Sequence, residues 1–94
     1  MRVRWLCAAI ANLIAETEYI PRDNPAAAAR VETEITRGVE KLCRFPSLGR
    51  PGRVSGTREL IIPGTPYIVP YRVRHDTIEI LRVFHAARRW PEAF

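Results

Sequence analysis

The sequence has few cysteines, almost no lysine and no long hydrophobic run. Its two cysteines, Cys7 and Cys43, are too few for a disulfide framework, and no Cys-x-x-Cys spacing of a metal site is present. No segment approaches the roughly 20 apolar residues that cross a bilayer. The basic residues Arg2 and Arg4 precede an apolar run that Asn12 soon interrupts, which is not typical of a signal peptide. We therefore expect a cytoplasmic protein without membrane contact, with both cysteines reduced and buried.

The motifs that carry catalytic or cofactor chemistry are also missing. No carboxylate pair, Ser-His-Asp arrangement or metal cluster is discernible, and we expect no cofactor. The Gly-rich stretch 49–53 lacks the Gly-Lys-Ser/Thr ending of a phosphate loop and precedes no helical pattern. We interpret that stretch as a mobile basic flap. At 94 residues, 47% of them hydrophobic and without an internal repeat, the chain is predicted to be one domain, 1–94.

The most strongly patterned stretch is 67–85, where two β-type runs meet at a polar turn. A two-residue turn at 75–76 predicts a hairpin in which Arg72 lies opposite Glu79, a favourable cross-strand pair. In that register the apolar side chains share one face of the hairpin. They are Val69, Tyr71, Val73, Ile78 and Ile80. The hairpin is therefore predicted to cover a hydrophobic core.

Two residues of the hairpin do not fit this register. Pro70 falls where a backbone N–H should bond to the partner strand, so either one hydrogen bond is lost or the turn is longer. Arg82 falls on the apolar face, where a guanidinium needs a partner. Such an arginine more often reaches the edge of a core, or pairs with a carboxylate, than serves a functional role.

The first half of the chain predicts one short strand and two helices. The alternation over 2–5 suits a strand, and apolar residues at helical spacing predict a first helix over 6–20, closed by Pro21. Asn24 followed by Pro25 is a strong start signal for a second helix, which should end near 45–46. Its apolar stripe consists of Ala28, Val31, Ile35, Gly38 or Val39, and Leu42.

A fourth strand candidate, 58–62, follows a loop over 47–57 and precedes the hairpin. The short linker between the helices implies that they are antiparallel. The predicted fold class is therefore α+β: an N-terminal strand and an antiparallel helical hairpin packed on a mainly antiparallel sheet of about four strands.

The net positive charge of the chain lies in its second half. Residues 1–43 hold six basic and six acidic residues, whereas residues 44–90 hold nine arginines and only three acidic residues. An arginine-rich genome would explain the residue type but not this segregation, so we expect a nucleic acid or an acidic protein to bind there. The candidate binding residues are Arg50, Arg53, Arg58, Arg72, Arg82 and Arg89.

His85 is the candidate catalytic residue. It lies at the end of the last predicted strand, close to Arg88 and Arg89, where it could act as a general acid or base on an RNA ribose or phosphate. The alternative is a structural histidine, which is commoner. Trp90 could stack on a base, but docking of the tail onto the sheet is the favoured interpretation.

Several stretches together resemble the RelE/ParE superfamily of bacterial type II toxin–antitoxin toxins, which includes plasmid-stabilisation toxins. The resemblance covers nearly the whole chain and rests on the order and spacing of its parts. These are Trp5 with the first helix, residues 24–28, Phe45-Pro46-Ser47-Leu48-Gly49-Arg50-Pro51, Gly56-Thr57-Arg58-Glu59-Leu60, Tyr71-Arg72-Val73, and residues 78–88.

This resemblance implies a growth-inhibiting toxin held inactive by a cognate antitoxin, which wraps the helices and the basic groove of the sheet. RelE-like members cleave mRNA on the ribosome, and ParE-like members poison DNA gyrase. The nuclease branch carries an arginine where this sequence has Ile68. In that branch His85 and Arg88 would be catalytic, with Arg50 and Arg53 as loop cations. Because a cation that stabilises the transition state is worth orders of magnitude in rate, the missing arginine slightly favours gyrase.

Overall fold

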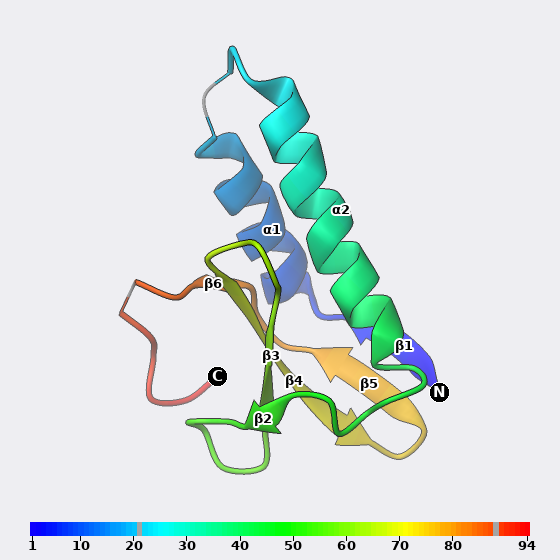
Figure 1. Cartoon of the computed structure of the whole chain (residues 1–94). Helices are drawn as coiled ribbons and strands as arrows, with labels where there is room; N and C mark the ends of the chain where they lie inside the picture. Colours follow the sequence, from blue (N-terminus) through cyan, green and yellow to red (C-terminus); the bar gives the residue numbers. More distant parts are fainter. Residues whose placement is uncertain (21, 88) are drawn as a thin grey trace.

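The computed structural model describes residues 1–20, 22–87 and 89–94 and is an α+β fold (Figure 1). Two helices, α1 (Cys7–Glu18) and α2 (Pro25–Lys41), follow a first strand, β1 (Arg2–Trp5). The remaining strands are β2 (Arg50–Pro51), β3 (Arg58–Ile61), β4 (Tyr67–Arg74), β5 (Thr77–Ile80) and β6 (Phe84–His85). The sheet has the order β1-β5-β4-β3-β2, and β6 also pairs with β4. The predicted fold class is confirmed.

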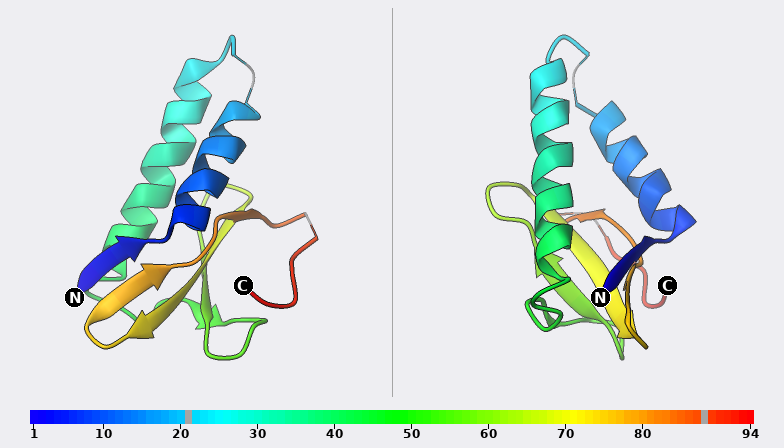
Figure 2. Two further views of the ribbon diagram at one scale, coloured as in Figure 1. Left: turned by 180° about the vertical axis from the view of Figure 1, so that it is seen from behind. Right: turned by 90° about the vertical axis from the view of Figure 1, so that its right-hand side faces the viewer.

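The helices and the sheet form two layers. The two helices run antiparallel, cover one face of the sheet with their lower halves and project beyond it with their linked ends (Figure 2). This projection accounts for the longest extent of the molecule, 42 Å against 28 and 23 Å. We call the face under the helices the helix side, and the opposite face, along which the C-terminal residues run, the tail side.

Helix α2 begins and packs as its sequence predicts. The Asn24 side chain accepts a hydrogen bond from the N–H of Ala27, and Pro25 occupies the first turn, where its missing N–H costs nothing. The buried residues of the stripe are Val31, Ile35, Gly38, Val39 and Leu42. Gly38 permits close contact with the sheet, since a Cβ there would lie only 2.7 Å from Cδ1 of Ile62.

Helix α1 differs from the expectation in two respects. It ends at Glu18 rather than at Ile20, and Pro21, the expected stop, lies outside the described residues. The expectation that both cysteines are buried was wrong: Cys7 is exposed and Cys43 is partly exposed, and both are free thiols. Cys7 opens α1, whereas Ala9, about 200° further round the helix, fills the buried position.

The hairpin has the predicted register. Arg72 lies opposite Glu79, and its Nε donates a hydrogen bond of 2.6 Å to Oε1 of Glu79. Four of the five predicted core residues of the hairpin are buried: Val69, Tyr71, Ile78 and Ile80. Val73 is the exception, with 42% of its surface exposed, because β4 extends past the end of its pairing with β3 at Tyr71.

A β-bulge interrupts the second strand of the hairpin. Tyr71 pairs with Ile80 and Ile68 pairs with Phe84, so three steps along β4 correspond to four along its partner. The extra residue reverses the alternation beyond β5, and Val83 rather than Arg82 enters the core. The expectation that Arg82 lies on the apolar face was therefore wrong.

The bulge also resolves the difficulty with Pro70. The N–H of Leu81 donates to the carbonyl of Pro70 at 3.0 Å, but Pro70 has no N–H to return the bond. The Arg82 guanidinium donates instead to the Leu81 carbonyl at 2.6 Å. On the other side, Asn12 of α1 accepts the N–H of Val83 at 3.1 Å. Side chains therefore replace the strand pairing where it fails.

The two edges of the sheet differ. At one edge, β1 pairs in parallel with β5, beginning with Arg2 beside Thr77. At the other edge, β2 is two residues long and pairs only with Arg58 and Glu59. The outer edge of β3 at Ile61 therefore has no strand partner among the residues that the structure describes.

Candidate functional site

The predicted basic residues are divided between the two faces of the sheet. Residues paired across neighbouring strands share a face, so the pairings place Arg50 and Arg72 on the tail side. Arg58, which pairs with Tyr71, and His85, which pairs with Tyr67, lie on the helix side. The structure therefore does not bring His85 together with the tail-side arginines.

Glu59 holds two of the tail-side arginines. Its side chain is 2% exposed, and its Oε1 accepts hydrogen bonds from Nη2 and Nε of Arg50 at 3.0 and 3.2 Å. Its Oε2 accepts the backbone N–H of Arg53 at 2.8 Å, with Nε of Arg53 at 3.6 Å. A buried carboxylate needs such partners. The stretch 49–53, expected to be a mobile flap, is instead fastened to the sheet.

Tyr71 fastens the preceding part of the same loop. Its hydroxyl donates to the Pro46 carbonyl and accepts the Gly49 N–H, each at 2.8 Å, and Arg58 donates to the Gly49 carbonyl at 2.8 Å. Burial raises the pKa of Tyr71, against the smaller opposing effects of Gly49 and Arg58. Gly49 is required here because an added Cβ would lie 2.6 Å from the Tyr71 ring.

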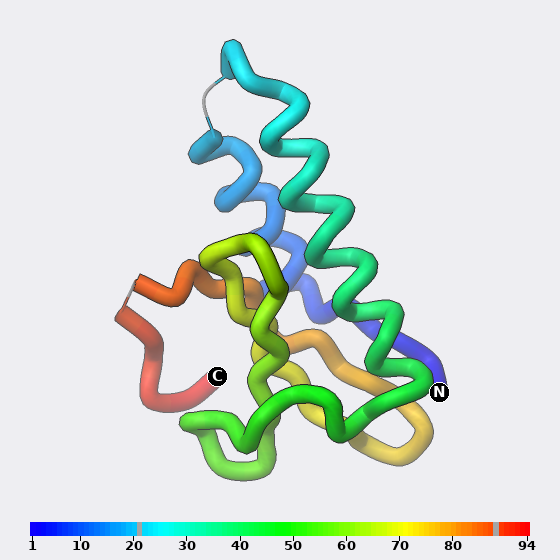
Figure 3. Tube along the Cα trace, viewed as in Figure 1, coloured from blue at the N-terminus to red at the C-terminus, as the bar shows by residue number. Residues whose placement is uncertain are grey.

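The C-terminal residues dock on the tail side, as favoured for Trp90 from the sequence. The Trp90 ring lies 4.8 Å from that of Phe84, and the Arg53 guanidinium lies 3.8 Å from the Trp90 ring centre. The ring of Phe94 lies 6.0 Å from Phe84 and has Arg82 at 5.5 Å. Figure 3 shows this segment curling back toward the sheet. Arg53 and Arg82 are therefore both used in contacts within the chain.

His85 is partly buried and has two defined contacts. Its ring meets that of Tyr67 edge-on at 5.7 Å, and its Nδ1 accepts the N–H of Ala87 at 3.1 Å. In the neutral imidazole the proton is therefore on Nε2. Arg88, its proposed companion, lies outside the described residues, and Arg89 is exposed.

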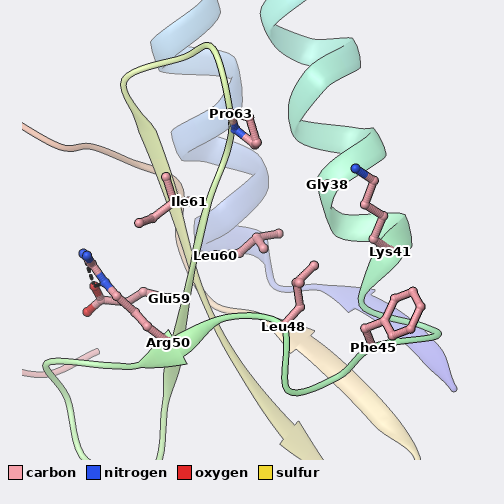
Figure 4. A pocket seen from close by; sticks show the side chains of 9 residues that line it. All are labelled: Gly38, Lys41, Phe45, Leu48, Arg50, Glu59, Leu60, Ile61 and Pro63. Carbon is pink, nitrogen blue, oxygen red and sulfur yellow. Dashed lines mark hydrogen bonds and ion pairs between the residues drawn. The ribbon is translucent and has the colours of Figure 1, made fainter.

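A pocket of about 450 Å³, not predicted from the sequence, lies between α2 and the outer edge of β3 (Figure 4). We call it the edge pocket. Its lining is mainly apolar and consists of Gly38, Lys41, Phe45, Leu48, Arg50, Glu59, Leu60, Ile61 and Pro63. Three of these apolar residues, Phe45, Leu48 and Ile61, are each more than half exposed. Two large apolar residues in a loop, Phe45 and Leu48, were the available sequence signal.

A second apolar surface lies on the outer side of α1. Ile10 and Ile14, one helical turn apart, are 45% and 52% exposed.

Within the described part of the chain, no group of three His, Cys, Asp or Glu side chains is placed to hold a metal ion. In the same residues, no helix has the length and apolarity needed to cross a membrane.

Residues 3–90 match the family described as the ParE toxin of the type II toxin–antitoxin system parDE. Two relatives align over almost their full length. Y4kP of Sinorhizobium fredii, a protein classed as a toxin, is 46% identical over 97% of this chain and 94% of its own. Toxin RelE2 of Caulobacter vibrioides is 31% identical over 93% of this chain and 97% of its own.

Two solved structures share the fold. The chromosomal ParDE system of P. aeruginosa superposes with a TM-score of 0.81 at 31% identity, over 90% of this chain and 95% of that one. The RelBE2 toxin–antitoxin complex of Mycobacterium tuberculosis gives a TM-score of 0.60 at 34% identity, over 89% and 95%. With the helical hairpin, the sheet and the basic second half described above, these matches show that the chain belongs to the ParE toxin family of type II toxin–antitoxin systems, within the RelE/ParE superfamily.

Proposed function

We propose that this protein arrests growth and is neutralised by a cognate antitoxin that binds it directly. Two similar structures are toxin–antitoxin systems, one of them described as a complex, and this chain has two exposed apolar surfaces that a partner would cover. One is the edge pocket, and the other is the outer side of α1 at Ile10 and Ile14. An antitoxin segment with apolar anchors and acidic flanks would fit the edge pocket, whose rim carries Lys41.

We propose DNA gyrase as the target. The observation that carries this choice is Ile68, which stands where the nuclease branch of the superfamily has an arginine. Ile68 is 6% exposed and pairs with Phe84, on which Trp90 and Phe94 pack. An apolar cluster therefore occupies the position at which a phosphate-stabilising cation would be needed. Cleavage of mRNA without that cation would be slower by orders of magnitude.

Ribosome-dependent mRNA cleavage is the second candidate. It is favoured by the 31% identity to a toxin named RelE2 and by the imidazole of His85, a group that could act as a general acid or base. In this reading His85 and Arg88 would be the catalytic groups, without a metal ion.

Pulse-labelling of DNA and protein synthesis in the minutes after induction of the isolated toxin separates the two targets. If gyrase is the target, DNA synthesis falls first, and gyrase alleles that evade the toxin restore growth. If protein synthesis falls first, the gyrase proposal is wrong and mRNA cleavage replaces it. Co-expression of the neighbouring antitoxin gene should restore growth in either case. Absence of growth arrest would contradict the toxin proposal itself.

The two histidines provide a matched pair of variants for the second candidate. His85→Asn removes the proposed general acid or base, and His75→Asn makes the same change in the exposed turn, where asparagine tolerates the observed φ of 55°. A nuclease should lose toxicity in the first variant only, while antitoxin binding is kept. Full toxicity of His85→Asn supports gyrase.

A further inference from the structure

Four arginines lie on the tail side of the sheet, on strands β1 and β4, which both pair with β5. The pairings of β1, β5 and β4 place Arg4, Glu79 and Arg72 in one row across the strands. They place Arg2, Thr77 and Arg74 in the next row. Residues in such rows point to the same face, so strands from opposite ends of the sequence build one basic surface.

Three of these four arginines form no ion pair with any acidic side chain that the structure describes. Arg72 is bound to Glu79, whereas Arg2, Arg4 and Arg74 are exposed and form no ion pair within the part of the chain that the structure describes. The hydrogen bond from Arg72 lowers the pKa of Glu79 most, and the charges of Arg74 and Arg4 lower it further. The turn of the same hairpin carries one further acidic side chain, Asp76. Positive charge is therefore in excess here.

The shape of this surface suits a chain of anions. Arg2, Arg4 and Arg74 line a hollow of about 560 Å³ together with Val3, His75, Thr77 and Glu79. The Thr77 hydroxyl can donate to an anion, and the Glu79 carboxylate is held by Arg72. Arginines two positions apart on one strand are separated by roughly 6.6 Å, and β1 and β4, two strands apart, by roughly 9.6 Å. This spacing allows successive groups of a polyanion each to meet a different arginine.

The composition of the surface favours a nucleic acid over an acidic protein segment. The two rows contain only Arg, Thr and Glu, with no apolar anchor of the kind on which protein interfaces depend. Contacts to a phosphodiester backbone need no such anchor, and guanidinium groups bind phosphate oxygens in pairs. The two apolar surfaces proposed above for a protein partner are the edge pocket and the outer side of α1.

We propose that Arg2, Arg4 and Arg74 form a binding site for the phosphodiester backbone of a nucleic acid. The site lies outside the loop and tail positions singled out from the sequence. It does not depend on which target the toxin attacks, because both gyrase and the ribosome hold nucleic acid.

The test is fluorescence anisotropy of the full-length toxin, freed of antitoxin, with a labelled DNA duplex and with single-stranded DNA and RNA of one sequence. The test variant is R2Q/R4Q/R74Q. The control variant, R22Q/R30Q/R37Q, removes the same charge from exposed positions of the helical hairpin. Exposed substitutions of this kind usually change stability by less than about 0.5 kcal/mol each, and circular dichroism will verify folding.

We expect the test variant to bind roughly tenfold or more weakly near 0.1 M salt. On duplex DNA, the negative slope of its log affinity against log salt concentration should become shallower by about 0.9 for each lost phosphate contact. The control variant should stay within about twofold of the wild type, since charge far from the hollow is screened over roughly 10 Å. Preference for RNA or for DNA in this assay identifies which nucleic acid is bound.

Equal losses in both variants would overturn the proposal, because binding would then reflect net charge alone. Unchanged binding of the test variant would overturn it as well. The remaining alternative, an acidic protein partner, is tested with polyglutamate as a competitor of the labelled duplex. If it binds as tightly as the duplex, with the same dependence on the three arginines, the surface is a site for acidic protein. Because growth arrest is not the readout, failure here leaves the proposed toxicity untouched.

Discussion

The hydroxyl of Tyr71 accepts a hydrogen bond from the backbone N–H of Gly49, 22 positions earlier in the chain. The same hydroxyl donates to Pro46, so one buried side chain determines the course of the loop that leads from α2 to β2. That loop forms one wall of the edge pocket through Leu48. The packing of the core and the shape of a candidate binding surface are therefore coupled at this residue.

Tyr71→Phe should destabilise the fold although it removes only one oxygen. The Gly49 N–H and the Pro46 carbonyl would both lose their partner in a buried place, at a cost of about 1–3 kcal/mol. Urea unfolding followed by circular dichroism measures the change. Ser55→Ala, which removes a hydroxyl group from an exposed loop position, serves as the control and should change stability by less than about 0.5 kcal/mol. Equal effects at the two positions would contradict the role given to Tyr71.

Glu59→Gln should loosen the stretch 49–53. The amide keeps the shape of the side chain but loses the charge that holds Arg50 and Arg53, at a cost of about 1–3 kcal/mol for hydrogen bonds to a charged group. Amide hydrogen exchange should speed up at Arg53, whose N–H donates to Glu59, while the Ile35 region of α2 keeps its protection. Protection that is unchanged at Arg53 would show that the carboxylate is not what fastens the loop.

The Arg72–Glu79 pair should make stability sensitive to acid. The hydrogen bond from Arg72 lowers the pKa of Glu79 in the folded state. The pair therefore stabilises the fold fully at pH values above the ordinary glutamate pKa of about 4.3. This stabilisation is lost as the pH falls through the lowered pKa of Glu79 in the folded protein. Thermal melts of wild type and Glu79→Gln should therefore converge only below about pH 4.3. Glu18→Gln, changed at an exposed position of α1, controls for loss of one charge.

Leu48→Asp should weaken neutralisation by the antitoxin without removing toxicity. The aspartate would place a charge in an apolar pocket at the centre of the proposed interface, at a cost of roughly 2 kcal/mol or about thirtyfold in affinity. Titration calorimetry of toxin with antitoxin measures the change. Ser47→Asp, an exposed neighbour outside the pocket lining, is the matched control. Equal affinity of the two variants would place the antitoxin elsewhere.

Local pattern was sufficient for the elements whose partners are close in sequence. The turn at 75–76 fixed the hairpin register through Arg72 and Glu79, and Asn24 with Pro25 fixed the start of α2. The bulge itself was not predicted, although two residues failed to fit the regular register that it interrupts. Pro70 removes a strand hydrogen bond in that register, and Arg82 would fall on the apolar face.

The candidate site was predicted less well because it depends on contacts between distant segments. The sequence identified the basic half of the chain but not which face each arginine occupies, which the pairings of β1 to β6 decide. Arg2 and Arg4, in the electrically balanced first half, join the basic surface only through the parallel pairing of β1 with β5. The edge pocket required the approach of α2 to β3 at Gly38.

The unpaired outer edge of β3 bears on how this protein behaves when it is alone. Exposed backbone N–H and C=O groups at a strand edge recruit further strands, and an apolar residue such as Ile61 strengthens the attraction. Here Pro51 and Pro63 bracket the open stretch, and neither can donate a backbone hydrogen bond. The edge can therefore pair with one short strand, but the prolines disfavour the addition of long strands that leads to aggregation. A chain produced faster than its partner would then stay dispersed long enough to be captured instead of aggregating.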